Sequence, residues 1–552
     1  MSQLPEIVYG HWDAIVIGTG MGGATVGYAL ARAGWRVLFC EKGKSTLGSG
    51  GLRGAYPETY LRESAESNLD RRRAFHDAGR YCDELADVSH GKPRRFVPFL
   101  GSGTGGSSAL YGMVLERLPR IDFTPRMHYP RALDSTLPER WPISYADLAP
   151  FYGAAERLYG VQGVSEPHAH EARAARASAL PPLSPVGFEL AEFLRGRGLH
   201  PYRLPLACDF VPGCPTCQGY LCARNCKRDS ARACLQPALE AYGARLLDNC
   251  EVLRLEVKGD AVTGVICRRA GSEFCVSGRT ILLAAGALNS PAVLLRSATP
   301  DWPTGLANLS GLVGRNLMRH FVDLYAVFPK ERHPSTGNAK ELGCSDFYLV
   351  HGEKFGTLQS FGRLPPAEML VDGMQQDATH RVGKWASVLF APAKPFLEPL
   401  IGRMFRNALV FATVMEDLPY PDNRVTLSDN GKGLGGTTVR YRIREHDARR
   451  IAEFRQRVRA VFKPYRTMLL KQAENNERLA HACGTCRFGT DPVASVVDAH
   501  NKAHGLKNLY IVDGSFFPSS GGTNPALTIA ANALRVADHL TARSALGPRA
   551  GP

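Results

Sequence analysis

The stretch Trp12-Asp-Ala-Ile-Val-Ile-Gly-Thr-Gly-Met-Gly-Gly23 decides the fold of the N-terminal part of the chain. Residues 12–18 form a short apolar run, which is typical of a strand buried in a parallel sheet. A helical pattern follows over 24–33 and ends at Gly34, and a second strand is predicted over 36–41. Strand, glycine turn, helix and strand in this order predict a Rossmann-type unit.

The glycine spacing in this turn suits a dinucleotide. Gly18 allows a tight turn, Gly20 lets the backbone approach a pyrophosphate, and Gly23 lets the helix pack closely on the strand. The helix N-terminus offers free N–H groups to phosphate, and Glu41 can accept hydrogen bonds from ribose hydroxyls. A glycine-rich turn in another fold is the alternative, and the motif alone does not separate FAD from NAD. The candidate cofactor-binding residues here are Gly18, Gly20, Met21, Gly22, Gly23 and Glu41.

A second glycine-rich loop, Gly101-Ser-Gly-Thr-Gly-Gly-Ser-Ser-Ala-Leu-Tyr-Gly112, offers a backbone that a flat or anionic group can touch. A flexible linker is the alternative. The loop runs directly into an apolar segment, which favours the binding interpretation. Its candidate cofactor-binding residues are Gly105, Gly106, Ser107, Tyr111 and Gly112.

The length and the charge of the chain limit the kind of protein that it can be. A chain of 552 residues is too long for one ordinary core, so we expect more than one domain. The net charge of +15 is spread along the chain, without the focused basic patch that nucleic-acid binding needs. We therefore expect no nucleic-acid partner, whereas attraction of acidic substrates or of a membrane surface stays open.

Targeting signals are not apparent in the sequence. The N-terminal residues 1–7 contain neither a charged n-region nor an apolar core, so we expect no signal peptide. No apolar run reaches about 20 residues, so no transmembrane helix is predicted. We expect a soluble, cytoplasmic protein. Its 14 cysteines are then expected to be thiols or ligands and not a disulfide framework.

The densest cysteine cluster lies between Cys208 and Cys234. Clustered thiolates are the usual ligands of iron–sulfur clusters and of zinc, but the spacing is shorter than that of ordinary zinc ribbons. We favour a loop with free thiols or one disulfide, and expect no metal. The iron–sulfur candidates are Cys214, Cys217, Cys222 and Cys226.

The α/β pattern returns after Asp229. A helix is predicted over 230–242, strands follow, and the last one ends at Gly286 before a helix over 289–297. Residues 326–475 alternate short apolar strands with Pro and Gly breaks and include a long helix over 445–462. An antiparallel sheet carrying helices would fit that region.

Ordered motifs along the chain resemble the glucose–methanol–choline (GMC) family of FAD-dependent oxidoreductases. One departure is Tyr111, where relatives often have Asn. Residues 160–230 and 330–475 match by position alone. The motifs are the turn at 18–23 with Glu41, Gly105-Gly-Ser-Ser108, Gly286-Ala-Leu-Asn-Ser-Pro-Ala-Val-Leu-Leu-Arg-Ser297, Val313-Gly-Arg-Asn-Leu-Met-Arg-His320, His481-Ala-Cys-Gly-Thr485 and Asn508 to Pro525.

The resemblance implies roles for individual residues. His481 corresponds to the family histidine that takes the hydroxyl proton, and Asn524 to the second active-site position, which would hold the substrate oxygen. His320 is expected to be structural. The resemblance further assigns cofactor contacts to Val252, Ala285, Gly286, Asp513, Gly514 and Pro525.

The predicted fold class is α/β (α+β overall), with a discontinuous Rossmann-type FAD-binding domain and a substrate domain with an antiparallel sheet covered by helices. The resemblance implies that an alcohol is oxidised to a carbonyl by hydride transfer to flavin N5, with oxygen or an unidentified acceptor reoxidising FAD. A non-redox lyase, a nicotinamide-linked reductase and an electron-transferring flavoprotein subunit are alternatives. The predicted domains are 10–130, 229–325 and 476–545 for FAD, and 131–228 and 326–475 for the substrate.

Overall fold

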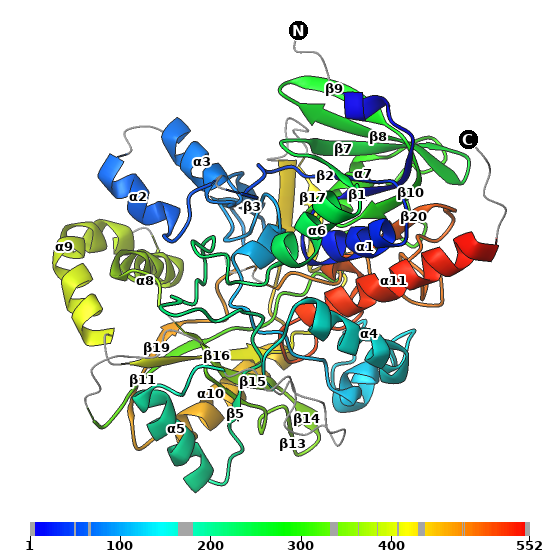
Figure 1. Ribbon diagram of the computed structural model, residues 1–552. Helices are drawn as coiled ribbons and strands as arrows, with labels where there is room; N and C mark the ends of the chain where they lie inside the picture. Colours follow the sequence, from blue (N-terminus) through cyan, green and yellow to red (C-terminus); the bar gives the residue numbers. More distant parts are fainter. Residues whose placement is uncertain are drawn as a thin grey trace.

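The computed structural model carries the chain as two large sheets with helices around them (Figure 1). It describes residues 6–48, 51–64, 68–163, 180–331, 340–362, 364–383, 385–405, 408–428, 436–476, 479 and 481–546.

The first sheet is parallel and has five strands in the order β20-β10-β1-β2-β6. Ile15 of β1 pairs with Ile281 of β10, and Ile281 pairs with Leu509 of β20. The sheet therefore combines three regions that are far apart in the sequence, as predicted for a discontinuous Rossmann-type domain. Its strands are β1 (Trp12–Ile17), β2 (Val37–Cys40), β6 (Arg245–Leu247), β10 (Gly278–Leu283) and β20 (Leu509–Ile511).

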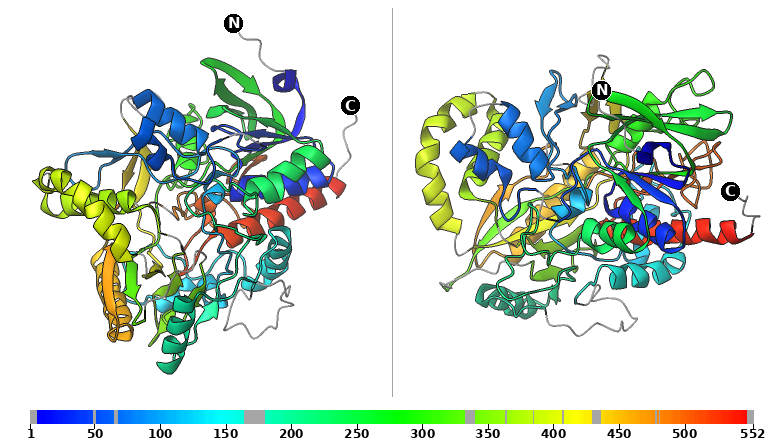
Figure 2. Two further views of the ribbon diagram at one scale, coloured as in Figure 1. Left: turned by 60° about the vertical axis from the view of Figure 1, so that its left-hand side comes forward. Right: turned by 45° about the horizontal axis from the view of Figure 1, so that its top comes forward.

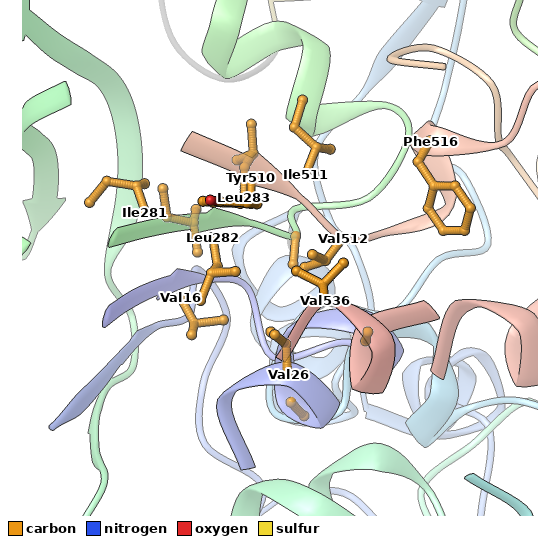
Figure 3. Close-up of a cluster of buried hydrophobic side chains, with 14 of the residues drawn as sticks. Val16, Val26, Ile281, Leu282, Leu283, Tyr510, Ile511, Val512, Phe516 and Val536 are labelled. Carbon is orange, nitrogen blue, oxygen red and sulfur yellow. The ribbon is translucent and has the colours of Figure 1, made fainter. Parts of the chain in front are cut away.

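Helices α1 (Met21–Arg32) and α11 (Ala526–Leu546) lie on one face of this sheet (Figure 1). Val26 of α1 and Val536 of α11 are both fully buried, and they point toward Leu282 and Val512 (Figure 3). Burying such a side chain contributes about 1.5–3 kcal/mol, so this contact fixes both helices on the sheet. The antiparallel sheet of β7 (Glu251–Lys258), β8 (Ala261–Arg269) and β9 (Ser272–Val276) lies on the other side, beside α7 (Asn289–Arg296).

The second large sheet is antiparallel and has the order β19-β11-β16-β15-β12-β5. Helix α10 (Glu445–Val461) buries Ile451, Phe454 and Val458 along one face, as its 3.6-residue periodicity predicts. The strands are β5 (Tyr202–Arg203), β11 (Leu324–Phe328), β12 (Leu342–Cys344), β15 (Gly356–Ser360), β16 (Leu409–Met415) and β19 (Arg466–Lys471). This arrangement confirms the predicted substrate-domain architecture.

Smaller elements connect the two sheets. A four-stranded sheet pairs β17 (Arg424–Leu427) and β18 (Thr437–Arg440) with β3 (Leu85–Asp87) and β4 (Arg94–Phe96), which precede them by more than 300 residues. It therefore joins segments that were predicted to belong to different domains. The predicted domain bounds stay a prediction. Other elements are α2 (Pro57–Ser64), α3 (Asn68–Asp77), α5 (Pro185–Gly196), β13 (Leu349–Val350) and β14 (Glu353–Lys354).

Three helical segments differ from the sequence predictions or were absent from them. Helices α8 (Ala367–Val382) and α9 (Trp385–Phe405) lie at the opposite end of the molecule from α11 (Figure 2). Helix α9 contains three prolines, residues that normally indicate a break, so the local sequence gave no helix signal. The helix predicted over 230–242 begins as a π-helix at Ala231–Leu235 and continues as α6 (Gln236–Ala241). Helix α4 (Tyr145–Leu158) begins with a capping box, in which Ser144 and Asp147 bond to each other's backbone N–H groups.

Within the part of the chain that the structure describes, we find no helix with the length and apolarity that a bilayer-crossing segment requires.

Close packing of α1 on the sheet predicts a stability effect at Gly22. A Cβ atom at this position would overlap the Val512 carbonyl oxygen. We expect Gly22→Ala to cost about 1–3 kcal/mol of stability and to lower the thermal unfolding midpoint. Gly196→Ala, at the exposed end of α5 where a Cβ meets nothing within 4 Å, is the matched control and should leave the midpoint unchanged or raise it. Equal midpoints for the two variants would contradict the packing argument.

Candidate functional site

The turn between β1 and α1 has the backbone geometry that a dinucleotide site needs. Gly18 has φ +95°, in the left-handed region that favours glycine, and a Cβ at Gly23 would overlap the Gly18 carbonyl oxygen. A Cβ at Gly20 would meet nothing within 4 Å. Of these three glycines, Gly20 thus leaves open the space that a pyrophosphate could approach, beside the N-terminus of α1.

Glu41 stands directly after β2 and is buried. Its Oε2 accepts from the Thr19 N–H (2.9 Å) and from Thr19 Oγ1 (2.6 Å), and its Oε1 accepts from the N–H groups of Gly43 (3.0 Å) and Gly103 (3.2 Å). Burial raises the pKa of Glu41, and these hydrogen bonds oppose the rise. A carboxylate has about four acceptor positions. A ribose hydroxyl would therefore share the Glu41 carboxylate with protein donors. The Thr19 hydroxyl is the donor that can rotate to another acceptor most easily, because the other donors are backbone N–H groups.

The second glycine-rich loop lies against the first. A Cβ at Gly106 would come within 3.0 Å of Gly20 Cα, and the Gly105 N–H donates to Thr19 Oγ1 (3.3 Å). Ser107 lies in the short 3-10 helix Gly106–Ala109 that follows. The fold thus brings together two predicted cofactor loops that are about 85 residues apart in the sequence.

The carboxyl ends of β10 and β20 form the next part of the site. Asp513 Oδ2 accepts from the Gly286 N–H (2.9 Å), and Oδ1 accepts from the Ser515 N–H (2.8 Å). Its carboxylate therefore holds two loops together. A Cβ at Gly286 would meet nothing within 4 Å, and Ala285 lies against Gly18.

Three other predicted cofactor residues border these loops. Val252 is buried in β7, two residues beyond Cys250, whose N–H donates to the Glu41 carbonyl (2.9 Å). Gly514 accepts from the Gly484 N–H (3.2 Å), which links the Asp513 loop to the segment of His481. Pro525 directly precedes α11.

His481 forms a pair with His320. Their Nδ1 atoms are 2.9 Å apart and their rings meet edge to face. The Nε2 atom of His320 lies 3.1 Å from the Ser520 carbonyl oxygen and 2.9 Å from the Gly521 carbonyl oxygen. The pair therefore links the His481 segment to the loop that carries Asn524. The sequence placed His320 outside the site because nothing local connects it to His481.

Two adjacent carboxylates after β16 hold this arrangement in place. Asp417 Oδ1 accepts from the His320 N–H (3.1 Å) and from Ser520 Oγ (2.9 Å). Glu416 Oε1 accepts from the Gly521 N–H (3.1 Å). All five residues are buried, so each hydrogen bond forms away from water.

Lys354 neutralises this region. Its Nζ forms ion pairs with Glu416 Oε2 (2.5 Å) and with Asp122, and all three side chains are 0% exposed. Burial raises the pKa of Asp122 to about 6, against the opposing effect of Lys354. Tyr129 donates to Glu416 (2.7 Å), and Tyr348 donates to Asp122 (2.5 Å).

Asn524 lies in a second buried polar network. Its Nδ2 donates to Gln359 Oε1 (2.9 Å) and to Glu116 Oε2 (3.3 Å). Glu116 also accepts from Gln359 Nε2 (2.6 Å), from Thr523 and from Tyr202 (2.5 Å). Burial raises the pKa of Glu116, against those hydrogen bonds.

Lys340 is a cation whose charge interacts with Glu116 and with His481. Burial, partly offset by the charge of Glu116, lowers the pKa of Lys340 to about 8. The charge of Lys340 also lowers the pKa of His481, after burial and His320. A Cβ at Gly112 would lie 2.6 Å from Lys340 Cε. The lysine thus lies beside the glycine-rich loop, and its charge acts on the histidine. The Tyr111 hydroxyl donates to the Arg228 carbonyl (2.7 Å).

Sequence reasoning missed several members of this site. His320, Lys340 and Gln359 have no local signature that ties them to His481 or Asn524. Glu116 did carry a signal, because it is a carboxylate that follows the apolar run after Gly112.

Comparisons with known proteins agree with this architecture. The 6'''-hydroxyparomomycin C oxidase of Streptomyces lividus is 31% identical over 559 residues, which cover 96% of this chain and 92% of that protein. Two family models described as GMC oxidoreductase match residues 208–322 and 419–533. The chain belongs to the GMC oxidoreductase family. It is therefore an oxidoreductase, and the resemblance inferred from its motifs is confirmed.

Other relatives of this GMC oxidoreductase have similar sequence identities to it. Paromamine 6'-oxidase of Streptomyces fradiae is 29% identical over 547 residues, covering 95% of this chain and 90% of that protein. The 2-methyl-1,2-propanediol dehydrogenase of Mycolicibacterium austroafricanum is 28% identical over 562 residues, covering 96% and 95%. The crystal structure of pyridoxine 4-oxidase from Mesorbium loti superposes with a TM-score of 0.63 at 20% identity, covering 96% of this chain and 99% of that one, and shares the fold.

The buried ion pairs of this GMC oxidoreductase predict a large cost for removing Lys354. Lys354→Met leaves two carboxylates buried without their cation, and breaking such a pair costs about 3–5 kcal/mol of unfolding free energy. Lys394→Met, which removes the partly exposed pair of Lys394 with Asp372 (2.6 Å), should cost less than about 1 kcal/mol. Denaturant unfolding of both variants provides the comparison. A Lys354→Met protein as stable as the wild type would show that Asp122 and Glu416 do not depend on the lysine.

Proposed function

We propose that this GMC oxidoreductase oxidises an alcohol to a carbonyl compound, with FAD as its cofactor, His481 as the base and Asn524 as the residue that holds the substrate oxygen. The observation that carries the proposal is the His320–His481 pair. Bound FAD would supply the hydride acceptor, flavin N5.

Hydrogen bonding sets which nitrogen of His481 is the base. His320 Nε2 faces two carbonyl oxygens, which only accept, so this nitrogen must carry a proton. In neutral His320 the Nδ1 atom is then an acceptor, and His481 Nδ1 must donate to it. Neutral His481 therefore has its free lone pair at Nε2. That nitrogen can take the hydroxyl proton while the hydride leaves the carbinol carbon.

The electrostatic surroundings keep both imidazoles neutral. Burial lowers the pKa of His320. Burial, the neighbouring His320 and Lys340 lower the pKa of His481 well below its usual value of 6.5. A base must be unprotonated to act, so His481 is ready at neutral pH. The proton that it takes needs an exit, because the protonated imidazole is unfavourable there.

Glu116 supports the proposed role of Asn524. A carboxylate only accepts, so it orients the Gln359 amide with Nε2 toward itself and Oε1 toward Asn524. Both of the Asn524 N–H groups are then used by Gln359 and Glu116. The Asn524 Oδ1 atom remains to accept from a substrate hydroxyl, which would aim the hydroxyl oxygen without a change of charge.

The cofactor fits the open backbone at Gly20 and Gly286, the N-terminus of α1 and the two adjoining glycine-rich loops. The hydrogen bonds of Asp513 support an indirect role for its carboxylate, which positions the backbone of Gly286. We retain as cofactor-binding residues Gly18, Gly20, Met21, Gly22, Gly23, Glu41, Gly105, Gly106, Ser107, Tyr111, Gly112, Val252, Ala285, Gly286, Asp513, Gly514 and Pro525.

The polar lining favours a polar alcohol. Lys340 and Glu116 carry charge next to His481 and Asn524, and an apolar chain would bury them without compensation. The three relatives described above are named for an aminoglycoside, paromamine and a diol. A small polyol or amino sugar is therefore the proposed substrate class.

Anaerobic reduction of the purified flavoprotein tests this function. We expect a polyol or an amino sugar to bleach the visible flavin band, and an apolar long-chain alcohol to leave the absorbance of that band unchanged. His481→Gln should retain flavin and slow the bleaching by about 10²–10⁴-fold, the usual contribution of a general base. A protein that binds no FAD would overturn the cofactor assignment. Unchanged reduction in His481→Gln would remove the histidine from the mechanism and favour the electron-transfer alternative.

The positioning role of His320 predicts a change in pH dependence. In the wild type the rate of flavin reduction should fall only well below pH 6.5, because the pKa of His481 is lowered. His320→Ala removes the acceptor of the His481 Nδ1–H and opens space beside this imidazole. Because burial is the main cause of the lowered pKa, we expect the acid limb to move up toward 6.5 and the rate to drop at least about 10-fold.

His320→Asn provides the matched control. Its Oδ1 can accept from His481 Nδ1, and asparagine tolerates the φ of +59° at this position. It should recover part of the rate and of the wild-type pH profile. If Ala and Asn behave alike at every pH, the hydrogen bond to His481 has no influence on the base.

A further inference from the structure

Residues 204–229 form a partly buried segment with isolated β-bridges in place of helices or strands of its own. Irregular segments of this length inside a compact domain usually need a specific stabilising element. Five cysteines lie in this segment, four of them at most 5% exposed. They are Cys208, Cys214, Cys217, Cys222 and Cys226.

The thiols converge on Cys226. The Cys226 Sγ is 3.1 Å from the Cys214 Sγ and 3.5 Å from the Cys222 Sγ. The Sγ atoms of Cys208, Cys214 and Cys226 all lie within 4.8 Å of one another. Cys208 was not among the sequence candidates, because its distance along the chain hides a contact that the bridge between Cys208 and Lys227 creates.

Local turns direct the cysteines inward. Gly213, Thr216 and Asn225 have φ of +69°, +48° and +52°, and each directly precedes a cysteine. Two of these three are not glycine, so their left-handed backbone costs energy that other interactions must offset. A contact that holds the following side chains in one place would do so.

We propose that Cys208, Cys214, Cys222 and Cys226 bind one zinc ion. A tetrahedral zinc site with Zn–S bonds of about 2.3 Å separates its sulfur atoms by about 3.8 Å. Among Cys208, Cys214 and Cys226 the sulfur spacings, one of 3.1 Å and all under 4.8 Å, bracket this value. The Cys222 Sγ lies 3.5 Å from that of Cys226 but outside this close set of three, so the Cys222 side chain must turn toward the ion to complete the site. A four-iron cluster places each thiolate on a different iron and so holds all four farther apart. The four thiols release their protons to solvent when the ion binds.

The surroundings suit an anionic thiolate site. Lys227 is 1% exposed, and its Nζ donates to the carbonyls of Ala109 (2.8 Å) and Tyr220 (3.0 Å). A lysine held in place beside clustered thiolates can offset part of their negative charge.

A second thiol cluster, Cys40, Cys250 and Cys267, has a different setting. Its three Sγ atoms also lie within 4.8 Å, but they sit in the hydrophobic core beside strands β2 and β8. Within the described part of the chain neither cluster has a fourth ligand within 4.8 Å of all its members, but only the first has a further thiol, that of Cys222, in contact with one of them. Three packed core thiols need no ligand to explain their burial.

Zinc at this position would brace the second glycine-rich loop. The Gly219 N–H donates to the Leu110 carbonyl (2.8 Å), and Lys227 holds Ala109. Both partners lie at the end of the short 3-10 helix that begins at Gly106. A structural ion would therefore stabilise the loop from outside, and its binding does not depend on the proposed alcohol chemistry.

Metal analysis of the purified full-length protein tests the proposal. We expect about one zinc per chain in the wild type. Cys208→Ser and Cys226→Ser should lose it, whereas Cys275→Ser, at an exposed cysteine of β9, should retain it. Expression in cobalt should give a coloured protein with thiolate-to-cobalt absorption, which keeps the test valid if a cysteine variant does not fold.

Three outcomes would overturn the site. Iron with inorganic sulfide would make it a cluster of a different kind. A Cys214–Cys226 disulfide found by mass spectrometry would remove two ligands. All fourteen cysteines reacting as free thiols in a metal-free protein would leave a packed thiol loop. Flavin content and alcohol-dependent bleaching, measured on the same samples, separate failure of the zinc site from failure of the proposed function.

Discussion

Buried charge at the end of β16 is the constraint on which the arrangement of the site depends. Glu416 and Asp417 are adjacent and fully buried, and they reach different partners. One is neutralised by Lys354, and the other holds the backbone of His320. Unpaired carboxylates in such surroundings would be very costly. The polar groups around them must therefore stay in hydrogen-bonding positions, which also restricts the movement of the histidine pair.

This constraint also explains how two sheets produce one site. Strand β16 belongs to the antiparallel sheet, whereas His481 and Asn524 lie on loops that flank β20 of the parallel sheet. Hydrogen bonds from Ser520 and Gly521 to the two carboxylates connect these layers. Catalytic groups on loops gain precision when rigid elements hold them from both sides.

The hydrogen bonds around Asn524 likewise have their donor and acceptor directions set by one group. Glu116 can only accept, and every amide around it must turn accordingly. His320 has the same effect on His481, because two carbonyl oxygens determine its tautomer. In both cases a neighbouring group decides which atom of the proposed catalytic residue is available. For an enzyme of the GMC oxidoreductase family, this links the fold directly to the proposed proton transfer.

The nucleotide-type turn and the GMC resemblance could be predicted from the sequence alone, and so could the candidacy of His481 and Asn524, because each depends on short-range spacing or ordered motifs. The contact of His320 with His481 and the presence of Cys208 in the thiol cluster became apparent only in the folded chain. Helix α9 likewise forms despite prolines that locally oppose it. These features come from contacts between distant segments, and local periodicity contains no information about such contacts.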